Sequence, residues 1–342
     1  MNSLRPLAHI YVLDIPLLQP FTTASGTVSR REVAVVSLSV DGETGWGEAA
    51  PYPGQDETFA SVVKATRDGA TTPTLSAALD EALADLVARL ESRRLTDDVP
   101  GIRTELPSSI AVGMGPDVLE IVDTLAADGI SRIKAKIAPG HTDHIRAIRD
   151  AHPDLTMGVD ANGSFDSSTW GELMSLSDEN VAYLEQPMTD LAGAEIVALS
   201  EAGFMIFADE SVRSVEQASD VLDLPGVSGV VVKPGRLGWR GSLAVIAASR
   251  GAGMSWRASG LLETGIGRAF SEALAAAEDA FVSDIAPAQR YIAYDTVVSR
   301  SKGAGVVVPS GHGIGIDVDE ERVAGLAIES FPINPLVVPI LD

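Results

Sequence analysis

The sequence predicts an α/β protein built on a modified TIM barrel of the (β/α)7β type, preceded by an N-terminal α+β capping domain. From about residue 108 onward, short apolar runs alternate with helix-like stretches, which is typical of parallel strands joined by crossover helices. The segment before this region lacks the alternation, so a separate domain is expected there. Six reactive or polar residues close successive apolar runs at steps of 24 to 26 residues: Lys136, Asp160, Glu185, Asp209, Lys233 and Ser259.

Residues 1–105 are predicted to form the capping domain. Residues 32–40 (EVAVVSLSV) have the composition of a strand, and the turn at 41–43 returns the chain into a second strand, which is a hairpin pattern. Two stretches rich in alanine, 57–68 and 75–95, have the apolar spacing of helices. Short strands followed by helices predict an antiparallel α+β module rather than a further part of the barrel.

Two loops, 21–26 and 50–54, flank the hairpin and are expected to face the mouth of the barrel. Loops in that position are candidates for a lid that excludes water and sets specificity. The last residues, 311–342, lose the strand–helix alternation and are expected to fold back onto the capping domain. The barrel is therefore assigned to residues 106–310.

Seven strands and seven helices are predicted in the barrel. The strands are 108–112, 131–137, 155–160, 181–185, 204–209, 227–233 and 254–259, with an eighth, weaker strand near 281–285. The helices are 116–128, 142–151, 166–176, 190–201, 214–223, 239–251 and 265–279. An open doubly wound sheet is the alternative, but the number of strands disfavours it. In a barrel, the residues at the carboxyl ends of the strands meet at one face, where the active site lies.

The composition limits the kinds of partner. The 48 acidic and 25 basic residues give a formal net charge of −23, which disfavours nucleic acids and anionic membranes. The chain has no cysteine, so disulfides and zinc–thiolate sites are excluded. The first residues lack a signal-peptide pattern, and no apolar run approaches about 18 residues. A cytoplasmic protein that acts on a small carboxylate substrate is expected, and the oligomeric state is left open.

Three of the strand-end residues are carboxylates, Asp160, Glu185 and Asp209. Carboxylates that converge on one point repel each other, so a cation is expected among them. Oxygen ligands without Cys or His favour a hard cation, and Mg²⁺ fits this set. Alternatively, the two aspartates could merely cap the helices that follow them. Helix capping does not explain Glu185, so we predict a magnesium site.

Three lysines lie beside these carboxylates in the predicted barrel. Lys134 and Lys136 are two apart on one strand, so their side chains share a face. Lys233 ends a strand on the far side of the ring. Mutual repulsion and a nearby Mg²⁺ would lower the pKa of a lysine towards the range of a base. A solvated edge strand is the alternative for the first pair, but it is much less natural for a lysine that ends the run GVVVK.

Five short motifs resemble the barrel motifs of the enolase superfamily, whose sites use a Lys or His base with Mg²⁺. They are Lys134-Ala135-Lys136, Asp160-Ala161-Asn162, Glu185-Gln186-Pro187, Asp209-Glu210-Ser211 and Lys233-Pro234-Gly235. Their order and spacing match over the whole predicted barrel, and the N-terminal segment resembles the capping domain of that family. Residues 256–260 contain no histidine, and Lys233 closes the sixth strand. The chain therefore resembles the muconate-lactonizing branch rather than the mandelate-racemase branch.

Within that branch, the segments 136–140, 259–268 and 283–285 are similar to o-succinylbenzoate synthases and N-succinylamino acid racemases. The resemblance implies dehydration of 2-succinyl-6-hydroxy-2,4-cyclohexadiene-1-carboxylate, a step of menaquinone synthesis, through an enediolate stabilised by Mg²⁺. It implies that Lys136 removes the α-proton and then protonates the departing hydroxide in a syn elimination, while Lys233 stays protonated. The residues that it assigns are Lys134, Lys136 and Lys233 for catalysis, Asp160, Glu185 and Asp209 for the metal, and Asn162, Ser259 and Gly260 for the substrate.

Other activities remain open at this point. The same lysines can serve racemisation of N-succinylamino acids or epimerisation of dipeptides, in which one lysine removes a proton and the other returns it. A sugar-acid dehydratase is disfavoured by the missing histidine, and a non-catalytic barrel by the intact set of carboxylates and lysines. Trp239 and the pair Trp256-Arg257 depart from the small residues that the family would place there, and are expected to reshape the pocket.

Overall fold

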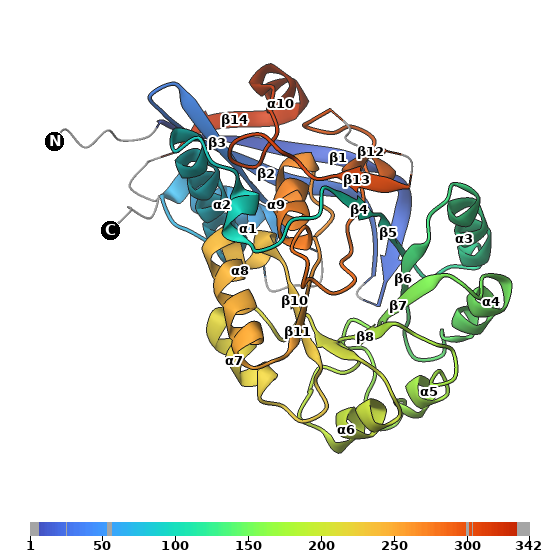
Figure 1. Cartoon of the computed structure of the whole chain (residues 1–342). Coiled ribbons are helices and arrows are strands. Elements are labelled where there is room, and N and C mark those ends of the chain that lie inside the picture. Colours follow the sequence, from blue (N-terminus) through green and yellow to red (C-terminus); the bar gives the residue numbers. More distant parts are fainter. Residues whose placement is uncertain (1–6, 25, 53–56, 299–300, 303, 334–342) are drawn as a thin grey trace.

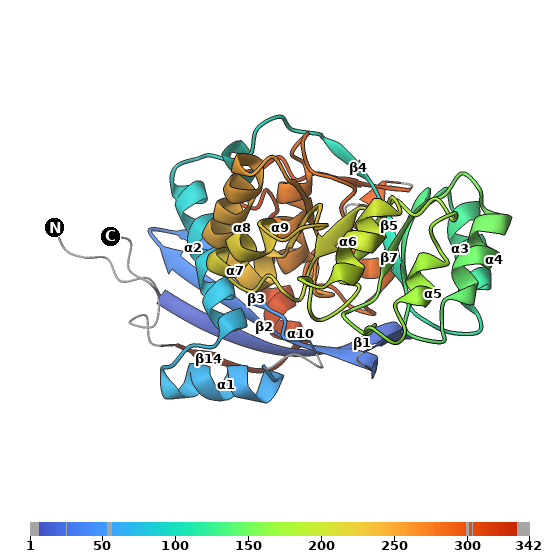
Figure 2. The ribbon, with the colours of Figure 1, turned by 90° about the horizontal axis from the view of Figure 1, so that it is seen from below.

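The computed structural model describes residues 7–24, 26–52, 57–298, 301–302 and 304–333. Its capping domain is a four-stranded antiparallel sheet in the order β14-β1-β2-β3 (Figure 1). The strands are β1 (Leu7–Thr23), β2 (Gly26–Val40), β3 (Glu43–Ala49) and β14 (Ala327–Pro332), and the helices are α1 (Phe59–Asp68) and α2 (Pro73–Leu90). Figure 2 shows both helices beside this sheet, where they share a buried core with Ile10, Val36 and Leu38. β14 pairs with β1, so the two ends of the described chain meet in one sheet.

The hairpin between β2 and β3 closes in a two-residue turn. Val40 pairs with Glu43, and Asp41 and Gly42 between them have φ angles of 52° and 86°. Positive φ at both central positions defines the type I′ turn, whose twist matches that of the flanking strands. The Asp-Gly pair suits it because both residues tolerate the left-handed region.

β3 lies directly against α2 because its inner positions are glycines. A Cβ atom on Gly47 would lie 2.0 Å from the backbone oxygen of Ala78, and one on Gly45 would lie 2.2 Å from that of Ala82. The next residue, Glu48, then reaches the barrel. Glycine in β3 therefore sets the distance between the sheet of the capping domain and α2.

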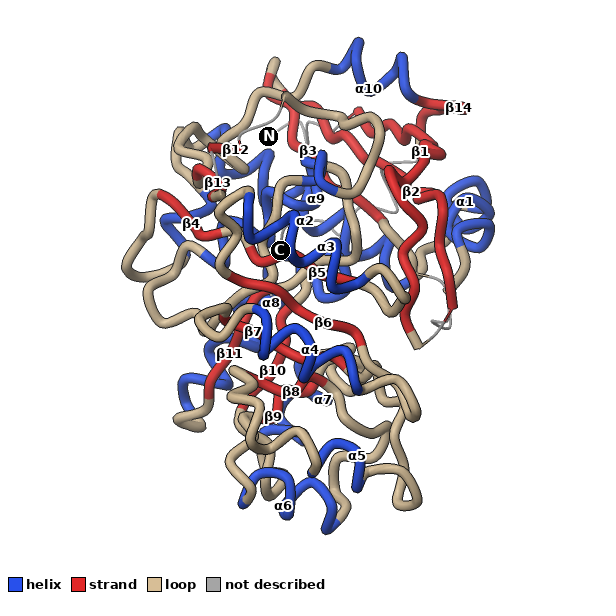
Figure 3. Tube along the Cα trace, turned by 90° about the vertical axis from the view of Figure 1, so that its right-hand side faces the viewer, coloured by secondary structure: helices blue, strands red, loops and turns tan. Residues whose placement is uncertain are grey.

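Seven parallel strands form the barrel in the order β11-β10-β9-β8-β7-β6-β5, curled as Figures 1 and 3 show. The strands are β5 (Ser109–Val112), β6 (Arg132–Lys136), β7 (Thr156–Asp160), β8 (Tyr183–Glu185), β9 (Ile206–Ala208), β10 (Gly229–Val232) and β11 (Ser255–Ala258). The helices around them are α3 (Val118–Ala127), α4 (Asp143–Ala151), α5 (Gly171–Met174), α6 (Ala194–Glu201), α7 (Val215–Leu222), α8 (Pro234–Gly251) and α9 (Gly265–Ala275). The predicted parallel arrangement is confirmed.

The prediction of a regular eighth strand at 281–285 is wrong. The segment instead makes single backbone hydrogen bonds to both ends of the curled sheet. Phe281 and Asp284 donate to β11 at 2.9 and 3.0 Å, while Ser109 of β5 donates to the carbonyl of Ile285 at 2.8 Å. No continuous ladder forms, since the N–H of Ala258 donates to the hydroxyl of Ser283 instead of to a backbone carbonyl, yet the segment fills the gap between β11 and β5.

Two other predictions differ from the structure. The helix expected at 166–176 is reduced to the single turn of α5. The side chain of Asp166 accepts from the backbone N–H groups of Ser168 and Thr169, and such a local turn competes with helix formation. The loop expected at 21–26 is largely hairpin, with Phe21 opposite Val28. Ser25 and residues 53 and 54 of the second predicted loop lie outside the described residues.

Short elements complete the molecule. They are the strands β4 (Glu105–Pro107), β12 (Ser301–Lys302) and β13 (Gly305–Val307), the helix α10 (Glu320–Leu326), and the 3₁₀ turns Leu95–Asp98 and Ala288–Arg290. β4, β13 and β12 form a separate small sheet. Among the described residues, none of the helices is long and apolar enough to cross a membrane.

Candidate active site

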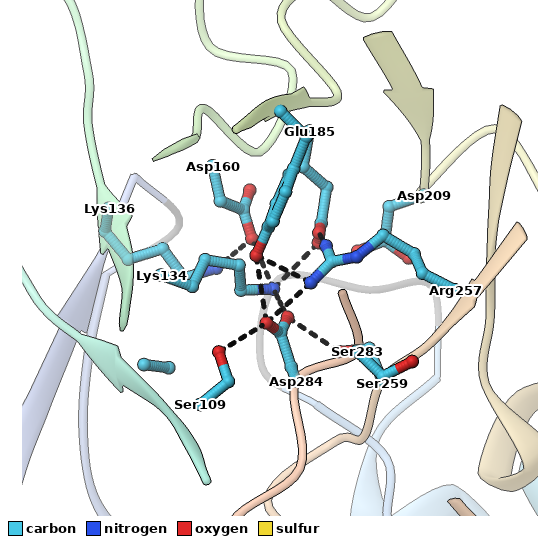
Figure 4. Close-up of polar contacts among 12 residues, drawn as sticks. Ser109, Lys134, Lys136, Asp160, Glu185, Asp209, Arg257, Ser259, Ser283 and Asp284 are labelled. Carbon is cyan, nitrogen blue, oxygen red and sulfur yellow. Dashed lines mark hydrogen bonds and ion pairs between the residues drawn. The ribbon is translucent and has the colours of Figure 1, made fainter. Parts of the chain in front are cut away.

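The residues predicted for the site gather at the carboxyl ends of the barrel strands. Lys136, Asp160 and Glu185 are the last residues of β6, β7 and β8, and Asp209 and Lys233 directly follow β9 and β10. A cavity of about 490 Å³ opens there. The predicted residues that line it are Lys134, Lys136, Asn162, Lys233, Ser259 and Gly260. The three carboxylates are fully buried and lie behind this lining, where Figure 4 shows Asp160 and Glu185 facing Lys134 and Lys136.

Lys136 and Lys233 each bond to one carboxylate. The Nζ atom of Lys136 donates to Oδ2 of Asp160 at 2.7 Å and to Oδ1 of Asn162 at 3.0 Å. The Nζ atom of Lys233 donates to Oδ2 of Asp209 at 2.6 Å, and Arg236 holds the other oxygen of Asp209 at 3.0 Å. Both lysine side chains are almost fully buried, so their ammonium groups are directed by these bonds.

Lys134 lies deeper and bonds to three carboxylates. Its Nζ atom is 3.0 Å from Asp160, 2.8 Å from Glu185 and 2.6 Å from Asp284. Burial acts to lower its pKa, but the charges of Asp160 and the other two carboxylates prevail and raise it well above the usual value. Lys134 is therefore held as an ammonium ion between the carboxylates.

The lowered lysine pKa predicted from the sequence does not arise from the protein groups alone. Burial acts to lower the pKa of Lys136, and Lys134 repels it, yet the charge of Asp160 outweighs both and the net shift is upward. The prediction also counted a nearby Mg²⁺ and therefore stays a prediction, but it omitted the carboxylate that each of the two lysines contacts.

Arg257 is a member of the site that the sequence did not assign. It is fully buried on β11, and its Nη2 atom donates to Oδ1 of Asp284 and to the hydroxyl of Tyr183, both at 2.6 Å. Its Nη1 atom donates to Oε2 of Glu185. An arginine inside an otherwise apolar strand was the available signal, as was Asp284 in the motif at 283–285, which carried no predicted role.

The carboxylates have the chemistry of a site for a hard divalent cation. Asp160 and Glu185 share the ammonium of Lys134, at 3.0 and 2.8 Å, and carboxylates brought this close need a cation or a proton between them. Burial, reinforced by the charge of Asp160, raises the pKa of Glu185 to about 8. The Oε2 atom of Glu210 is buried and has no hydrogen-bond partner, while Oε1 accepts from Asn162 at 2.9 Å. Together these donors fit Mg²⁺.

The predicted metal ligands are not arranged as a cage in the part of the chain that the structure describes. No group of three His, Cys, Asp or Glu side chains there has the geometry to hold an ion. The reason is that Asp160, Glu185 and Asp209 each bond to a lysine or an arginine. A metal held by these three residues would take the place of some of those contacts. Helix capping was the alternative role for Asp209. The side chain that caps α7 is that of Ser214, so Asp209 does not have this role.

The remaining predicted residues fall into two groups. Ser259 donates to Oδ2 of Asp284 at 3.2 Å and lines the cavity together with Gly260. Phe21 and Tyr52, from the two predicted lid segments, also line it. Trp239 and Trp256 do not, because their indole N–H groups point to Asp98 and Asp279 away from the cavity. The prediction that the two tryptophans reshape the pocket is therefore wrong.

The chain is similar to known proteins over most of its length. Residues 8–68 match the family described as mandelate racemase / muconate lactonizing enzyme, N-terminal domain, and residues 117–322 match the family described as enolase C-terminal domain-like. An o-succinylbenzoate synthase of Geobacillus kaustophilus is 30% identical, over 91% of this chain and 92% of that protein. An N-succinylamino acid racemase of Thermus thermophilus is 28% identical, over 91% and 93%. A solved structure described as a probable mandelate racemase from Alicyclobacillus acidocaldarius has a TM-score of 0.83 at 26% identity, covering 97% of this chain and all of that one.

Proposed function

The chain belongs to the enolase superfamily, with the N-terminal and C-terminal domains of the mandelate racemase and muconate-lactonizing enzymes, and we propose that it is a magnesium-dependent o-succinylbenzoate synthase. The observation that carries the proposal is the pair Lys136 and Lys233 in one cavity. Three strands, β7 to β9, separate β6 from β10 in the curled sheet, so the two ammonium groups reach the cavity from opposite sides. Buried carboxylates lie between them.

In this proposal the substrate carboxylate lies over Asp160, Glu185 and Asp209. Mg²⁺ held by these residues would supply the positive charge that stabilises the carboxylate as the α-carbon loses its proton. Lys136 in its neutral form takes the α-proton and becomes an ammonium ion. The same ammonium returns that proton to the hydroxyl group leaving from the same face, so that water departs and the ring becomes aromatic.

Lys233 has a different role in the dehydration. Its ammonium group bonds to Asp209 at 2.6 Å and stays protonated throughout, opposite to Lys136. A fixed positive charge on that side stabilises the negative charge that spreads over the ring when the proton leaves. The hydroxyl of Ser259 and the backbone of Gly260 line the same cavity and are proposed to hold the succinyl arm.

A second candidate function is racemisation of N-succinylamino acids. The specific observation in its favour is again the opposed pair of lysines, because each could remove the α-proton of one enantiomer and return it to the other. A relative with this named activity is 28% identical over 91% of the chain. Dehydration needs one proton-transferring lysine, whereas racemisation needs two.

The experiment that tests the proposal measures loss of the cyclohexadiene absorbance with purified protein and Mg²⁺. Lys136→Ala should lower kcat by a factor of about 100 or more, as expected for loss of a general base. Lys64→Ala, on the exposed face of α1, is the matched control and should be unaffected. Chelation of the metal should abolish turnover, and added Mg²⁺ should restore it. Absence of turnover with folded, metal-loaded protein would refute the synthase proposal.

Exchange of the α-proton in heavy water separates the two candidates. With N-succinylamino acids, a racemase should exchange both enantiomers, Lys136→Ala should lose exchange from one of them, and Lys233→Ala should lose it from the other. If only the cyclohexadiene substrate reacts, the protein is a dedicated synthase. If neither substrate class shows exchange or turnover, the barrel either acts on another carboxylate or is not catalytic.

A further inference from the structure

Arg257 is the most completely bonded cation of the site. Its side chain has no exposed surface, and its guanidinium plane lies 3.7 Å from the ring centre of Tyr183. The Nε atom donates to the carbonyl of Val282 at 2.7 Å, and Nη2 donates to Tyr183 and Asp284. Only Nη1 reaches towards the predicted metal ligands, where it bonds to Oε2 of Glu185 (Figure 4). The other bonds fix the orientation of this contact.

The contact matters because both oxygens of Glu185 are engaged by cations. Oε1 accepts from Lys134 at 2.8 Å, and Oε2 accepts from Arg257. A lysine on a flexible stem can withdraw from a carboxylate, but a guanidinium held at three other points cannot. Any cation bound by Glu185 therefore binds next to a positive charge that stays in place.

Cations already match the carboxylates around the site in number when Glu210, whose Oε2 is buried, is counted with them. Among the described residues, four carboxylates are joined by ion pairs to five cations: Asp160, Glu185, Asp209 and Asp284 to Lys134, Lys136, Lys233, Arg236 and Arg257. A divalent metal adds two further positive charges to this group. All five cations contact a predicted metal ligand, and Arg257 is the one among them whose side chain has no exposed surface.

We propose that Arg257 is a positioning residue that fixes the carboxylate of Glu185 and weakens the affinity of the Asp160, Glu185 and Asp209 site for a divalent cation. The inference rests on the metal site of the proposed function. Its physical cause is repulsion between the guanidinium and the metal, together with the share of the Glu185 lone pairs that the guanidinium occupies. At a separation of a few ångströms, a unit charge changes the affinity for a divalent ion by about tenfold or more, even in a strongly screened site.

Calorimetric titration with Mg²⁺, and with Mn²⁺ followed by electron paramagnetic resonance, tests this without any substrate. Arg257→Met should bind both ions about tenfold more tightly than the wild type. Arg257→Lys, which keeps the charge on a stem that can withdraw, should have an affinity between those of the wild type and Arg257→Met. Arg250→Met is the control, because it also removes an arginine paired with an aspartate, but an exposed one at Asp279, away from the cavity. Its metal affinity should equal that of the wild type.

A second pair of variants keeps the test decisive if Arg257→Met folds poorly. Arg257→Met/Asp284→Asn removes both charges of one ion pair, and it is compared with Asp284→Asn alone. The double variant should bind the metal about tenfold more tightly than the single one. Unchanged or weaker binding on removal of Arg257, in either background, overturns the inference while leaving the metal site intact. Absence of Mg²⁺ and Mn²⁺ binding by the wild type overturns the metal site as well.

Discussion

Gly158 provides the sharpest test of how the floor of the site is built. It lies on β7, two residues before Asp160, and a Cβ atom at this position would lie 2.0 Å from Cζ and 2.3 Å from the hydroxyl of Tyr183. The tyrosine ring is fully buried and cannot turn away without leaving Arg257 and Asp284, to which its hydroxyl is bonded. Gly158→Ala therefore forces either overpacking or the loss of these bonds.

The size of the effect follows from the cheaper of the two outcomes. Overpacking in a core costs about 1–3 kcal/mol, and each hydrogen bond to a charged partner contributes about 1.5–3 kcal/mol. Because Tyr183 makes two such bonds, the structure should accept overpacking, so we expect Gly158→Ala to lower the free energy of unfolding by about 2 kcal/mol or more.

The assay is urea unfolding followed by circular dichroism, with the shift in midpoint converted by the slope of the transition. Gly251→Ala is the control, since an added Cβ there meets no atom within 4 Å. In a Tyr183→Leu background, the same Gly158→Ala change should cost almost nothing, because the ring atoms are gone. A loss below about 0.5 kcal/mol in the wild-type background would refute the reasoning, since ordinary surface substitutions have effects of that size.

Three further predictions concern the frame of the site. Glu48 is fully buried, and burial raises its pKa to about 7. Its protonated form therefore adds stability at low pH, and this stability is lost as the pH rises from about 4.5 to 7. Glu48→Gln lacks this loss, so between pH 5 and pH 8 its free energy of unfolding should rise by about 2 kcal/mol relative to that of the wild type, as measured by thermal unfolding. Gly47→Ala should lower the melting temperature because its Cβ meets the backbone of Ala78, and an unchanged value would contradict the close packing. Ser214→Ala removes the cap of α7 and should cost about 1 kcal/mol in urea unfolding, whereas Ser214→Asn should restore most of it.

The ring of strand-end residues could be predicted because it follows from a topological rule. Parallel strands in one barrel end at one face, so residues spaced by one strand–helix repeat, such as Lys136, Asp160 and Lys233, are brought together whatever their side chains do. The eighth strand at 281–285 could not be predicted in the same way. The side chain of Ser283 takes the N–H of Ala258 there, and that contact depends on how the ring closes rather than on local composition.

The effect of the protein groups on the lysine pKa was not predicted, because it depends on distances of a few ångströms. The sequence places Lys134 and Lys136 on one face of a strand, and this placement is what the structure shows. The sequence does not show that Nζ of Lys136 lies 2.7 Å from Asp160, whose charge makes the net shift of the Lys136 pKa upward. Neighbours on adjacent strands are set by the register of the sheet, in which Lys136 lies opposite Asp160.

Arg257 shows where the limit of sequence reasoning lies. Side chains two apart on a strand share a face, so once Ser259 is placed at the barrel interior, Arg257 must point inward and Trp256 outward. The structure has this arrangement, with Trp256 bonded to Asp279 on the outer side. An inward arginine in a barrel requires buried carboxylate partners, and the sequence offers several. Its partners, Glu185 and Asp284, lie 72 and 27 residues away, and only the three-dimensional closure of the barrel selects them. The strand pattern therefore predicts that a buried cation enters the site. That its partner is Glu185 comes from the structure alone, and the expected change in metal affinity depends on this contact.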